Sequence, residues 1–344
     1  GFGDPGSPKT VDDFFIYPDS VSILESDIEK MFNLDTLNAF IFRKFGDIYR
    51  YSNDLEQSKE YYLKGVKLCD KTNNSFKPEL LHTLGNASFL LGNLEDAFNF
   101  FQLAIDSEFD PYLKMKQMHR MSMVAFRARN HKKAIEVLDD IESSFKILNL
   151  SRIEQIAEMI TINNYKSFYY ADLGMKKESY KAFKLFQEYG TQIYNEIPDF
   201  DISFINSRNN TIGIPSGLND RFSRILPGNL EYDMIWLKIL NGDVNQAKNL
   251  IANSKLDQTQ ISRFNFMIEN KVGNHKKAVE LGNKLFTQNS LGGSYFSFYY
   301  AKSLLELGDI ESARPILERC ADVRAFGWTT GFFNLQSKEI LKSL

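Results

Sequence analysis

The sequence predicts an all-α protein built from stacked pairs of antiparallel helices. The first observation is the stretch 84–105, LGNASFLLGNLEDAFNFFQLAI, in which small and apolar residues follow the period of two helices joined by a short turn. The second is that the spacing within this stretch recurs along the chain. The third is the abundance of bulky side chains, 29 Phe and 16 Tyr among 344 residues, which suits packing between helices.

The turn inside this stretch lies at Gly92 and Asn93. Gly92 can adopt the left-handed conformation that ends the first helix, and the side chain of Asn93 can cap the N–H groups that begin the second helix. Gly85 on the first helix and Ala97 on the second are small, so the two backbones can approach closely. The apolar stripe of the second helix is too wide for one partner, and the pair therefore needs neighbours.

The same pattern predicts further helix pairs. A turn glycine followed five residues later by a small residue recurs at Gly174/Ser179, Gly242/Ala247, Gly273/Ala278 and Gly308/Ala313. In the last three, a potential capping residue follows the glycine: Asp243, Asn274 and Asp309. Two more turns lack the glycine, at Asn53-Asp54 and Arg129-Asn130. We predict seven pairs, whose small second-helix residues are Ser58, Ala97, Ala134, Ser179, Ala247, Ala278 and Ala313.

These pairs divide the chain into segments. We expect a tag or disordered lead at 1–10, a leading helix within 11–34, four repeats in 35–189, three repeats in 230–323 and a capping helix in 324–344. Residues 190–229 are rich in Pro, Gly, Asn and Asp, and they form either a degenerate repeat or an inserted loop. The two cysteines, Cys69 and Cys320, lie in repeats at opposite ends of the array, so we expect no disulfide.

The stretch 84–105 resembles the tetratricopeptide repeat, whose signature places L-G and Y in the first helix and A-x3-F in the second. Leu84-Gly85, Ala97 and Phe101 match it, and Phe45-Gly46 with Tyr49 matches its first half again. The small second-helix residues are 31 to 45 residues apart, except for one interval of 68, and the period of this family is about 34. The resemblance implies a right-handed α-solenoid of about seven to eight helix pairs.

In tetratricopeptide arrays, the first helix of each repeat lines a concave groove that binds extended peptides or partner helices. The resemblance therefore implies a set of peptide- or partner-binding residues: Arg43, Asp47, Arg50, His82, Asn86, Lys116, Arg120, Met123, Asn164, Phe168, Trp236, Arg263 and Asn270, with Tyr232, Tyr295 and Lys302 as further groove positions. Asn amides can pair with a peptide backbone, Arg and Lys can hold carboxylates, and Trp can anchor an apolar side chain.

Two classes within this family offer narrower resemblances. Lys116 and Arg120 resemble the basic residues with which carboxylate-clamp co-chaperones hold an acidic C-terminal tail, but Asp47 and Thr83 stand where that class has asparagine. The irregular, Asn-rich repeats also resemble bacterial quorum-sensing receptors that bind short peptides. The effector domain that such receptors carry in front of their repeats is not visible in residues 1–34.

We therefore predict a non-enzymatic scaffold that captures an extended peptide or partner segment in its groove. One alternative is a quorum-sensing-type peptide receptor, and another is an accessory repeat region of a larger enzyme or membrane-anchored protein. In a third, residues 190–229 fold back into the groove and regulate access to it.

Other functions are disfavoured by what the sequence lacks. Its four histidines, His82, His119, His131 and His275, show neither metal-site nor catalytic spacing, so we predict no catalytic residue, no metal and no cofactor. The balance of 41 basic and 44 acidic residues argues against direct nucleic-acid binding. No apolar run is long enough to span a membrane. We expect a cytoplasmic location and a protein or peptide partner; a removed signal peptide or anchor and the oligomeric state are left open.

Overall fold

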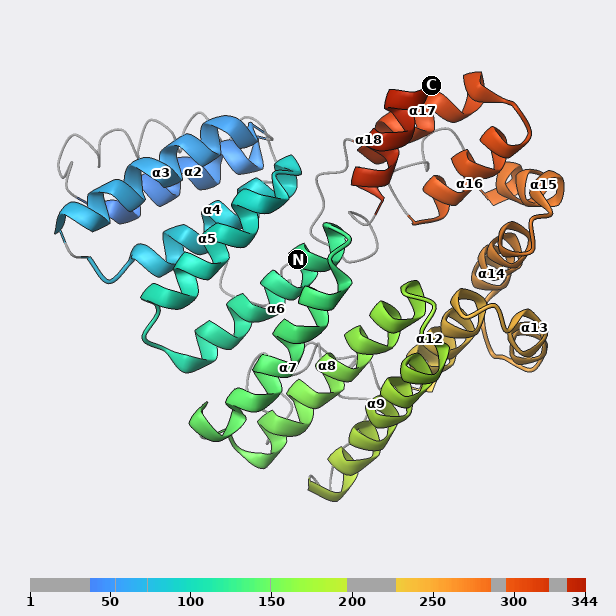
Figure 1. Cartoon of the computed structure of the whole chain (residues 1–344), viewed down its shortest axis with the longest axis horizontal. Coiled ribbons are helices and arrows are strands. Elements are labelled where there is room, and N and C mark those ends of the chain that lie inside the picture. The colour runs from blue at the N-terminus through green and yellow to red at the C-terminus, as the bar shows by residue number, and fades with distance from the viewer. Residues whose placement is uncertain are drawn as a thin grey trace. The chain divides into compact units, whose positions relative to one another are not determined.

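A computed structural model describes residues 38–52, 54–72, 74–148, 150–196, 227–285, 295–321 and 333–344. Fifteen helices lie within these ranges, and no strand occurs among them (Figure 1). The predicted all-α fold of consecutive helix pairs is confirmed. The chain divides into two compact units, residues 1–128 and residues 129–344, which we describe separately.

Unit 1 contains the first two helix pairs and the first helix of the third. Its helices are α2 (Ala39–Tyr51), α3 (Leu55–Thr72), α4 (Lys77–Leu91), α5 (Leu94–Ser107) and α6 (Pro111–Arg127). Each helix packs against the next along the chain. Thus α2, α4 and α6 are the first helices of successive repeats, and α3 and α5 are second helices.

Unit 2 contains the remaining helices. They are α7 (His131–Leu148), α8 (Arg152–Asp172), α9 (Lys176–Glu196), α12 (Pro227–Leu240), α13 (Val244–Ala252), α14 (Gln258–Lys271), α15 (His275–Leu285), α16 (Tyr295–Glu306), α17 (Ile310–Ala321) and α18 (Asn334–Ser343). The first helices α8, α12, α14 and α16 pack in succession, and α18 packs against α17. Ser151 and Glu154 form a capping box at the start of α8.

Two predicted segments lie largely outside the described residues. The leading helix within 11–34 belongs to a range that is not described, as do residues 197–226 of the irregular region 190–229. At the edges of that region, α9 continues to Glu196 and α12 begins at Pro227. The choice between a degenerate repeat and an inserted loop therefore stays a prediction.

The turns follow the predicted backbone conformation. All five turn glycines have a positive φ between 72° and 81°: Gly92, Gly174, Gly242, Gly273 and Gly308. Arg129, which replaces glycine in the third repeat, also has a positive φ of 63°. A residue with a Cβ atom pays about 1 kcal/mol for this conformation, so the turn geometry is retained even where its preferred residue is missing.

The predicted side-chain caps are only partly right. Asn93 and Asp243 occupy N-cap positions but form no side-chain cap. The carboxylate of Asp243 instead binds Lys176 at 2.5 Å and accepts a hydrogen bond from Tyr180. The side chain of Asp243 therefore contacts α9 and does not cap α13. Capping hydrogen bonds from the third residue of the following helix occur at Asp54, Asn130 and Asp309.

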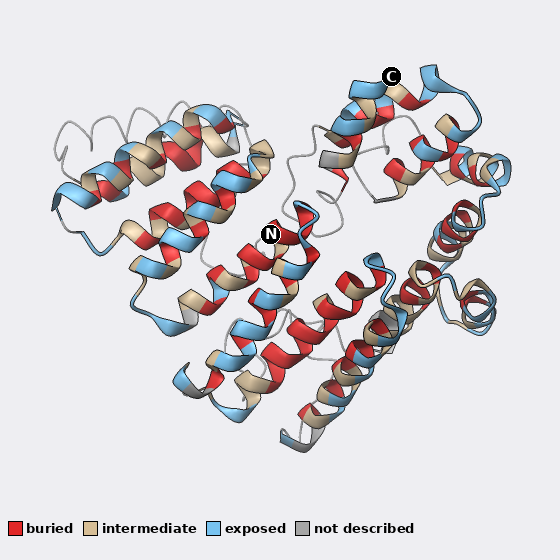
Figure 2. Cartoon of the chain, viewed as in Figure 1, coloured by how far each residue is buried: buried red, intermediate tan, exposed pale blue. Residues whose placement is uncertain are grey.

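Small residues bring the paired helices together. All seven predicted small residues of the second helices are 0% exposed. A Cβ atom placed on Gly85 would lie 2.9 Å from the ring of Phe101, and one placed on Gly46 would run into the ring of Tyr62. The buried sides of the helices face their neighbours (Figure 2). A glycine on the first helix therefore makes room for an aromatic ring on the second.

We expect Gly85→Ala to lower the free energy of unfolding by about 1–3 kcal/mol, because the added methyl group overpacks the contact with Phe101. Urea denaturation followed by circular dichroism measures this change. Asn99→Ala on the exposed side of α5 is the matched control and should change stability by less than about 0.5 kcal/mol. Equal effects of the two substitutions would contradict the role of the glycine.

Candidate functional site

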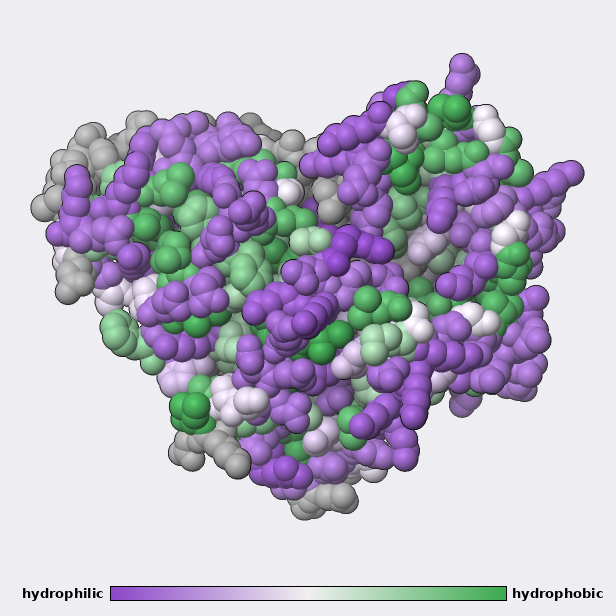
Figure 3. All heavy atoms as spheres, viewed as in Figure 1, coloured by the Kyte–Doolittle hydropathy of each residue, from purple (hydrophilic) through white to green (hydrophobic). Residues whose placement is uncertain are grey.

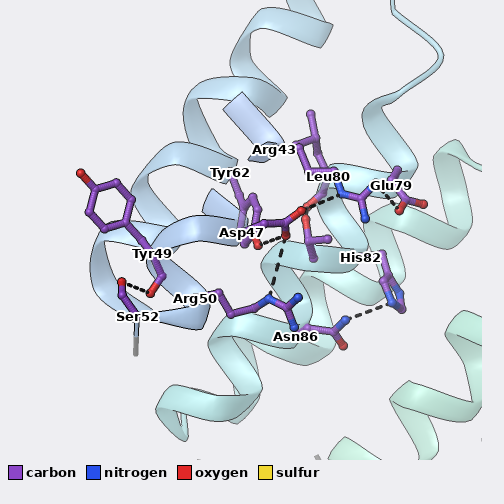
Figure 4. A network of polar contacts seen from close by, with 11 residues as sticks. Arg43, Asp47, Tyr49, Arg50, Ser52, Tyr62, Glu79, Leu80, His82 and Asn86 are labelled. Atoms are coloured by element: carbon purple, nitrogen blue, oxygen red, sulfur yellow. Dashed lines mark hydrogen bonds and ion pairs between the residues drawn. The ribbon is translucent and has the colours of Figure 1, made fainter. Parts of the chain in front are cut away.

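Polar side chains connect α2, α4 and α6 in unit 1. Arg43 of α2 binds Glu79 of α4 at 3.2 Å, and His82 of α4 is hydrogen-bonded to Gln117 of α6 at 2.5 Å. Figure 4 shows the α2 and α4 part of this network. We call this set the first-helix face, and its residues are Arg43, Asp47, Arg50, Glu79, His82, Asn86, Lys116, Gln117 and Arg120.

Asp47 is the buried centre of the α2 part. Its side chain is 8% exposed and lies 3.6 Å from Nε of Arg43 and 3.9 Å from Nε of Arg50. The hydroxyl of Tyr62, on the second helix α3, donates to Asp47 at 2.6 Å. Burial and the neighbouring Asp47 carboxylate raise the pKa of Tyr62, so this hydroxyl keeps its proton and remains a donor.

The two arginines of α2 are therefore already paired. Arg43 contacts two carboxylates, Asp47 and Glu79, and its guanidinium lies 6.0 Å from the centre of the Phe76 ring. Arg50 shares the carboxylate of Asp47. Two arginines thus face two carboxylates, and this part of the first-helix face carries no net charge.

His82 occupies the middle of the face and is neutral. Its Nδ1 donates to the amide oxygen of Gln117 at 2.5 Å, and its Nε2 accepts from Nδ2 of Asn86 at 3.0 Å. Its ring also packs against Phe101 of α5, with the ring centres 5.6 Å apart. The pKa of His82 is lowered to about 4, chiefly by burial. The positive charges of Arg120, Lys116 and Arg43 also lower this pKa, whereas the hydrogen bond to Gln117 raises it.

The α6 part of the face is positively charged. Lys116 and Arg120 are one helical turn apart, with Lys116 exposed and Arg120 half-buried. Within the described residues, Lys116 forms no ion pair. Met123, the third predicted position on this helix, is half-buried. Positive charge on the first-helix face is therefore concentrated on α6.

The predicted site residues on α8 lie in the interior. Residues 156–164 are all buried, as the colouring of α8 in Figure 2 shows. Asn164 is 2% exposed and donates to Asp233 of α12 at 3.3 Å, and Phe168 is 4% exposed. These two side chains hold unit 2 together and offer no exposed surface.

The C-terminal candidates are also largely used within unit 2. Asn270 is 8% exposed and donates to the carbonyl of Tyr299 and to the hydroxyl of Ser303. Trp236 is 5% exposed and packs on Phe264 and Phe296. The ring of Tyr232 also packs on Phe264, and the exposed Arg263 lies over the ring of Phe296. Lys302 is exposed, and the side chain of Tyr295 lies outside the described part of the chain.

The residues that complete the first-helix face were not all predicted. Glu79 and Gln117 gave no signal of their own, because each becomes part of the face only through a contact to another helix. Tyr62 could have been found, since Ser58-x3-Tyr62 matches the A-x3-F spacing with a hydroxyl added to the ring. The useful signal was a tyrosine at the position where the repeat motif has phenylalanine, because its hydroxyl needs a hydrogen-bond partner inside the protein.

The described residues contain neither a metal-ligand cluster nor a membrane-spanning helix. No cluster of His, Cys, Asp and Glu suited to a metal ion occurs among them. None of the helices that the structure describes is long and apolar enough to cross a membrane. On the surface seen in Figure 3, hydrophobic residues form patches between hydrophilic ones.

Removal of the Tyr62 hydroxyl tests the centre of the face. We expect Tyr62→Phe to lower the free energy of unfolding by about 1–3 kcal/mol, because the buried carboxylate of Asp47 loses a hydrogen-bond donor. Tyr61→Phe is the matched control: Tyr61 is half-buried and stacks on Phe45 and Tyr49, so a loss below about 0.5 kcal/mol is expected. Similar urea midpoints for the two variants would exclude this role of Tyr62.

His82 makes stability depend on pH. In the unfolded chain a histidine takes up a proton near pH 6.5, whereas the pKa of folded His82 is about 4. The unfolded state binds more protons between these values, so the free energy of unfolding decreases as the pH falls from 6.5 to 4. The contribution of His82 to this decrease is about 1–3 kcal/mol, and it should disappear in His82→Gln.

Urea denaturation of both proteins at several pH values between 7 and 4.5 measures this contribution. The two proteins differ only at residue 82, so the difference between the two curves isolates His82. Parallel curves would show that the folded protein does not hold His82 neutral.

Comparisons with known proteins agree with the fold. A sequence model of the tetratricopeptide repeat matches residues 44–72, which include the second half of α2 and all of α3. No curated protein matches the sequence. A tetratricopeptide repeat protein from Parabacteroides merdae has a similar structure, with a TM-score of 0.50 and 11% identity over 88% of this chain and 97% of that chain. At this identity the likeness concerns the fold alone.

Two further solved structures are more distant. The apo form of the quorum sensor NprR from B. thuringiensis has a TM-score of 0.49 and 14% identity over 89% of this chain and 83% of that chain. BtubC from P. vanneervenii has a TM-score of 0.43 and 12% identity over 73% of this chain and 95% of that chain. Residues 44–72 thus match the tetratricopeptide repeat itself, and the likeness to the first structure, with the turns and the buried small residues, shows that the chain has the fold of a tetratricopeptide-type helical-repeat protein.

Proposed function

We propose that this protein binds a carboxylate-bearing segment of a partner protein or peptide on the first-helix face. The tetratricopeptide fold supports a scaffold role, in which recognition takes place on the surface of the repeats. The observation that carries the proposal is the unequal charge of the face. The arginines of α2 are paired with Asp47 and Glu79, whereas Lys116 on α6 is exposed and has no ion-pair partner among the described residues.

This charge distribution places the acidic group of the ligand at α6. A carboxylate near α2 would have to compete with Asp47, which is buried and held by Tyr62 as well as by the two arginines. A carboxylate near α6 meets Lys116 and Arg120 one turn apart, where charge-assisted hydrogen bonds are the strongest available contacts. The half-buried amide of Asn86 lies beside this position through its bond to His82, and amides can pair with a peptide backbone.

Charge reversal tests the proposal. An array of random octapeptides is synthesised twice, once with Asp and Glu retained and once with Asn and Gln in their place, and is probed with the intact chain and with Lys116→Glu/Arg120→Glu. We expect the intact chain to prefer acidic peptides. The variant should lose at least about tenfold in affinity for them, equivalent to about 1.4 kcal/mol, because two favourable contacts become repulsive.

Lys67→Glu/Lys71→Glu is the matched control. It makes the same change of charge with the same spacing in unit 1, but on the exposed side of the second helix α3. Binding of acidic peptides should survive in this control and should weaken with added salt in the intact chain. Equal loss in both variants, or no preference for acidic peptides in the intact chain, would exclude the proposed site.

A further inference from the structure

His82 and Asn86 form a hydrogen-bonded pair that leaves one acceptor unused. Asn86 donates through Nδ2 to Nε2 of His82, while its own Oδ1 is buried and has no hydrogen-bond partner. A buried acceptor without a partner is costly. Rotation of the Asn86 amide by half a turn would bring Oδ1 to Nε2, and the contact would then need a proton on Nε2.

A protonated His82 is therefore compatible with all of its neighbours' hydrogen bonds. Nδ1 would continue to donate to Gln117, and Nε2–H would donate to the rotated Asn86 amide, which gives Oδ1 the partner it lacks. Hydrogen bonding thus does not prevent His82 from becoming charged. Burial and nearby cations do.

The charged groups around His82 come from three helices. Arg43 of α2 and Lys116 and Arg120 of α6 act on the ring with positive charge. On α4 itself, Glu79 lies one turn before His82 but is bound to Arg43. From α5 only the uncharged ring of Phe101 is in contact with the histidine. An anion placed at Lys116 and Arg120 would offset two of the three cations that oppose protonation.

We propose that His82 takes up a proton from solvent onto Nε2 when the first-helix face binds a carboxylate, so that proton uptake and ligand binding strengthen each other. The inference rests on the proposed function, because it requires an acidic ligand at α6. The bound carboxylate is then held by Lys116 and Arg120, and it is attracted by the charge of a histidine that becomes positive only in the complex. The ligand class is accordingly an acidic segment whose affinity rises in mildly acidic solution.

Linkage sets the size of the effect. Uptake of one proton allows at most a tenfold change in affinity per pH unit. If binding raises the pKa of His82 by about two units, affinity at pH 5 exceeds that at pH 7.5 by about tenfold. Above pH 5 most Asp and Glu side chains of the ligand remain ionised, so their own titration contributes little.

The experiment is calorimetric titration with the tightest acidic octapeptide from the array and with its Asn/Gln counterpart. Measurements in two buffers of different ionisation enthalpy at pH 5.0, 6.0 and 7.5 count the protons taken up on binding. For that shift we expect an uptake of about 0.8 proton at pH 5.0 and about 0.5 at pH 6.0 in the intact chain, and none in His82→Gln. His275→Gln is the matched control in unit 2, where this histidine contacts Ser303, and uptake should be unchanged there.

The outcomes separate the two proposals. Binding of the acidic peptide without proton uptake, or with uptake that persists in His82→Gln, overturns the inference and leaves the proposed function standing. No preference for the acidic peptide at any pH overturns both. Should His82→Gln fail to fold, the His82 ring resonance can be assigned by elimination with His119→Gln, His131→Gln and His275→Gln, and its pKa measured with and without peptide in the intact chain. An unshifted pKa then overturns the inference.

Discussion

The close contact between a first-helix glycine and a second-helix aromatic ring is the constraint on which the first two repeats depend. Gly46 accommodates Tyr62, and Gly85 accommodates Phe101. The same two rings reach the first-helix face: the hydroxyl of Tyr62 binds Asp47, and the ring of Phe101 packs against His82. The core therefore positions the polar face directly, and a change in the helix contact is also a change in the site.

This arrangement explains why the charge of the face is unequal. A buried carboxylate persists only when its hydrogen bonds and charge are compensated. Tyr62 supplies the hydrogen bond, and Arg43 and Arg50 supply the charge, so the two arginines of α2 are occupied by a carboxylate of its own interior. The described residues place no comparable carboxylate in an ion pair with Lys116. The exposed charge of Lys116 is therefore the feature of α6 on which the proposed binding of a carboxylate depends.

Local chemistry was predictable from the sequence, and long-range pairing was not. The turn glycines and the small second-helix residues follow from backbone conformation and steric limits, which neighbouring residues reveal. Asp243 read as a helix cap for the same reason, but its carboxylate pairs with Lys176 and Tyr180, which lie 67 and 63 residues earlier. The packing of the helices decides whether such a side chain binds a local or a distant partner. The spacing of residues in the sequence does not reveal this choice.

The same limit explains why groove positions carried over from one repeat do not all become surface. A polar side chain on a first helix can bond to the next first helix, as Asn164 does to Asp233 and Asn270 does to Ser303. His82 makes an equivalent bond to Gln117, but it is half-buried and lies next to the exposed Lys116. A ligand can influence such a hydrogen bond only where the bonded side chains lie close to the protein surface. The three side chains have similar chemistry, and their different burial is the reason for placing the proposed binding site at α4 and α6.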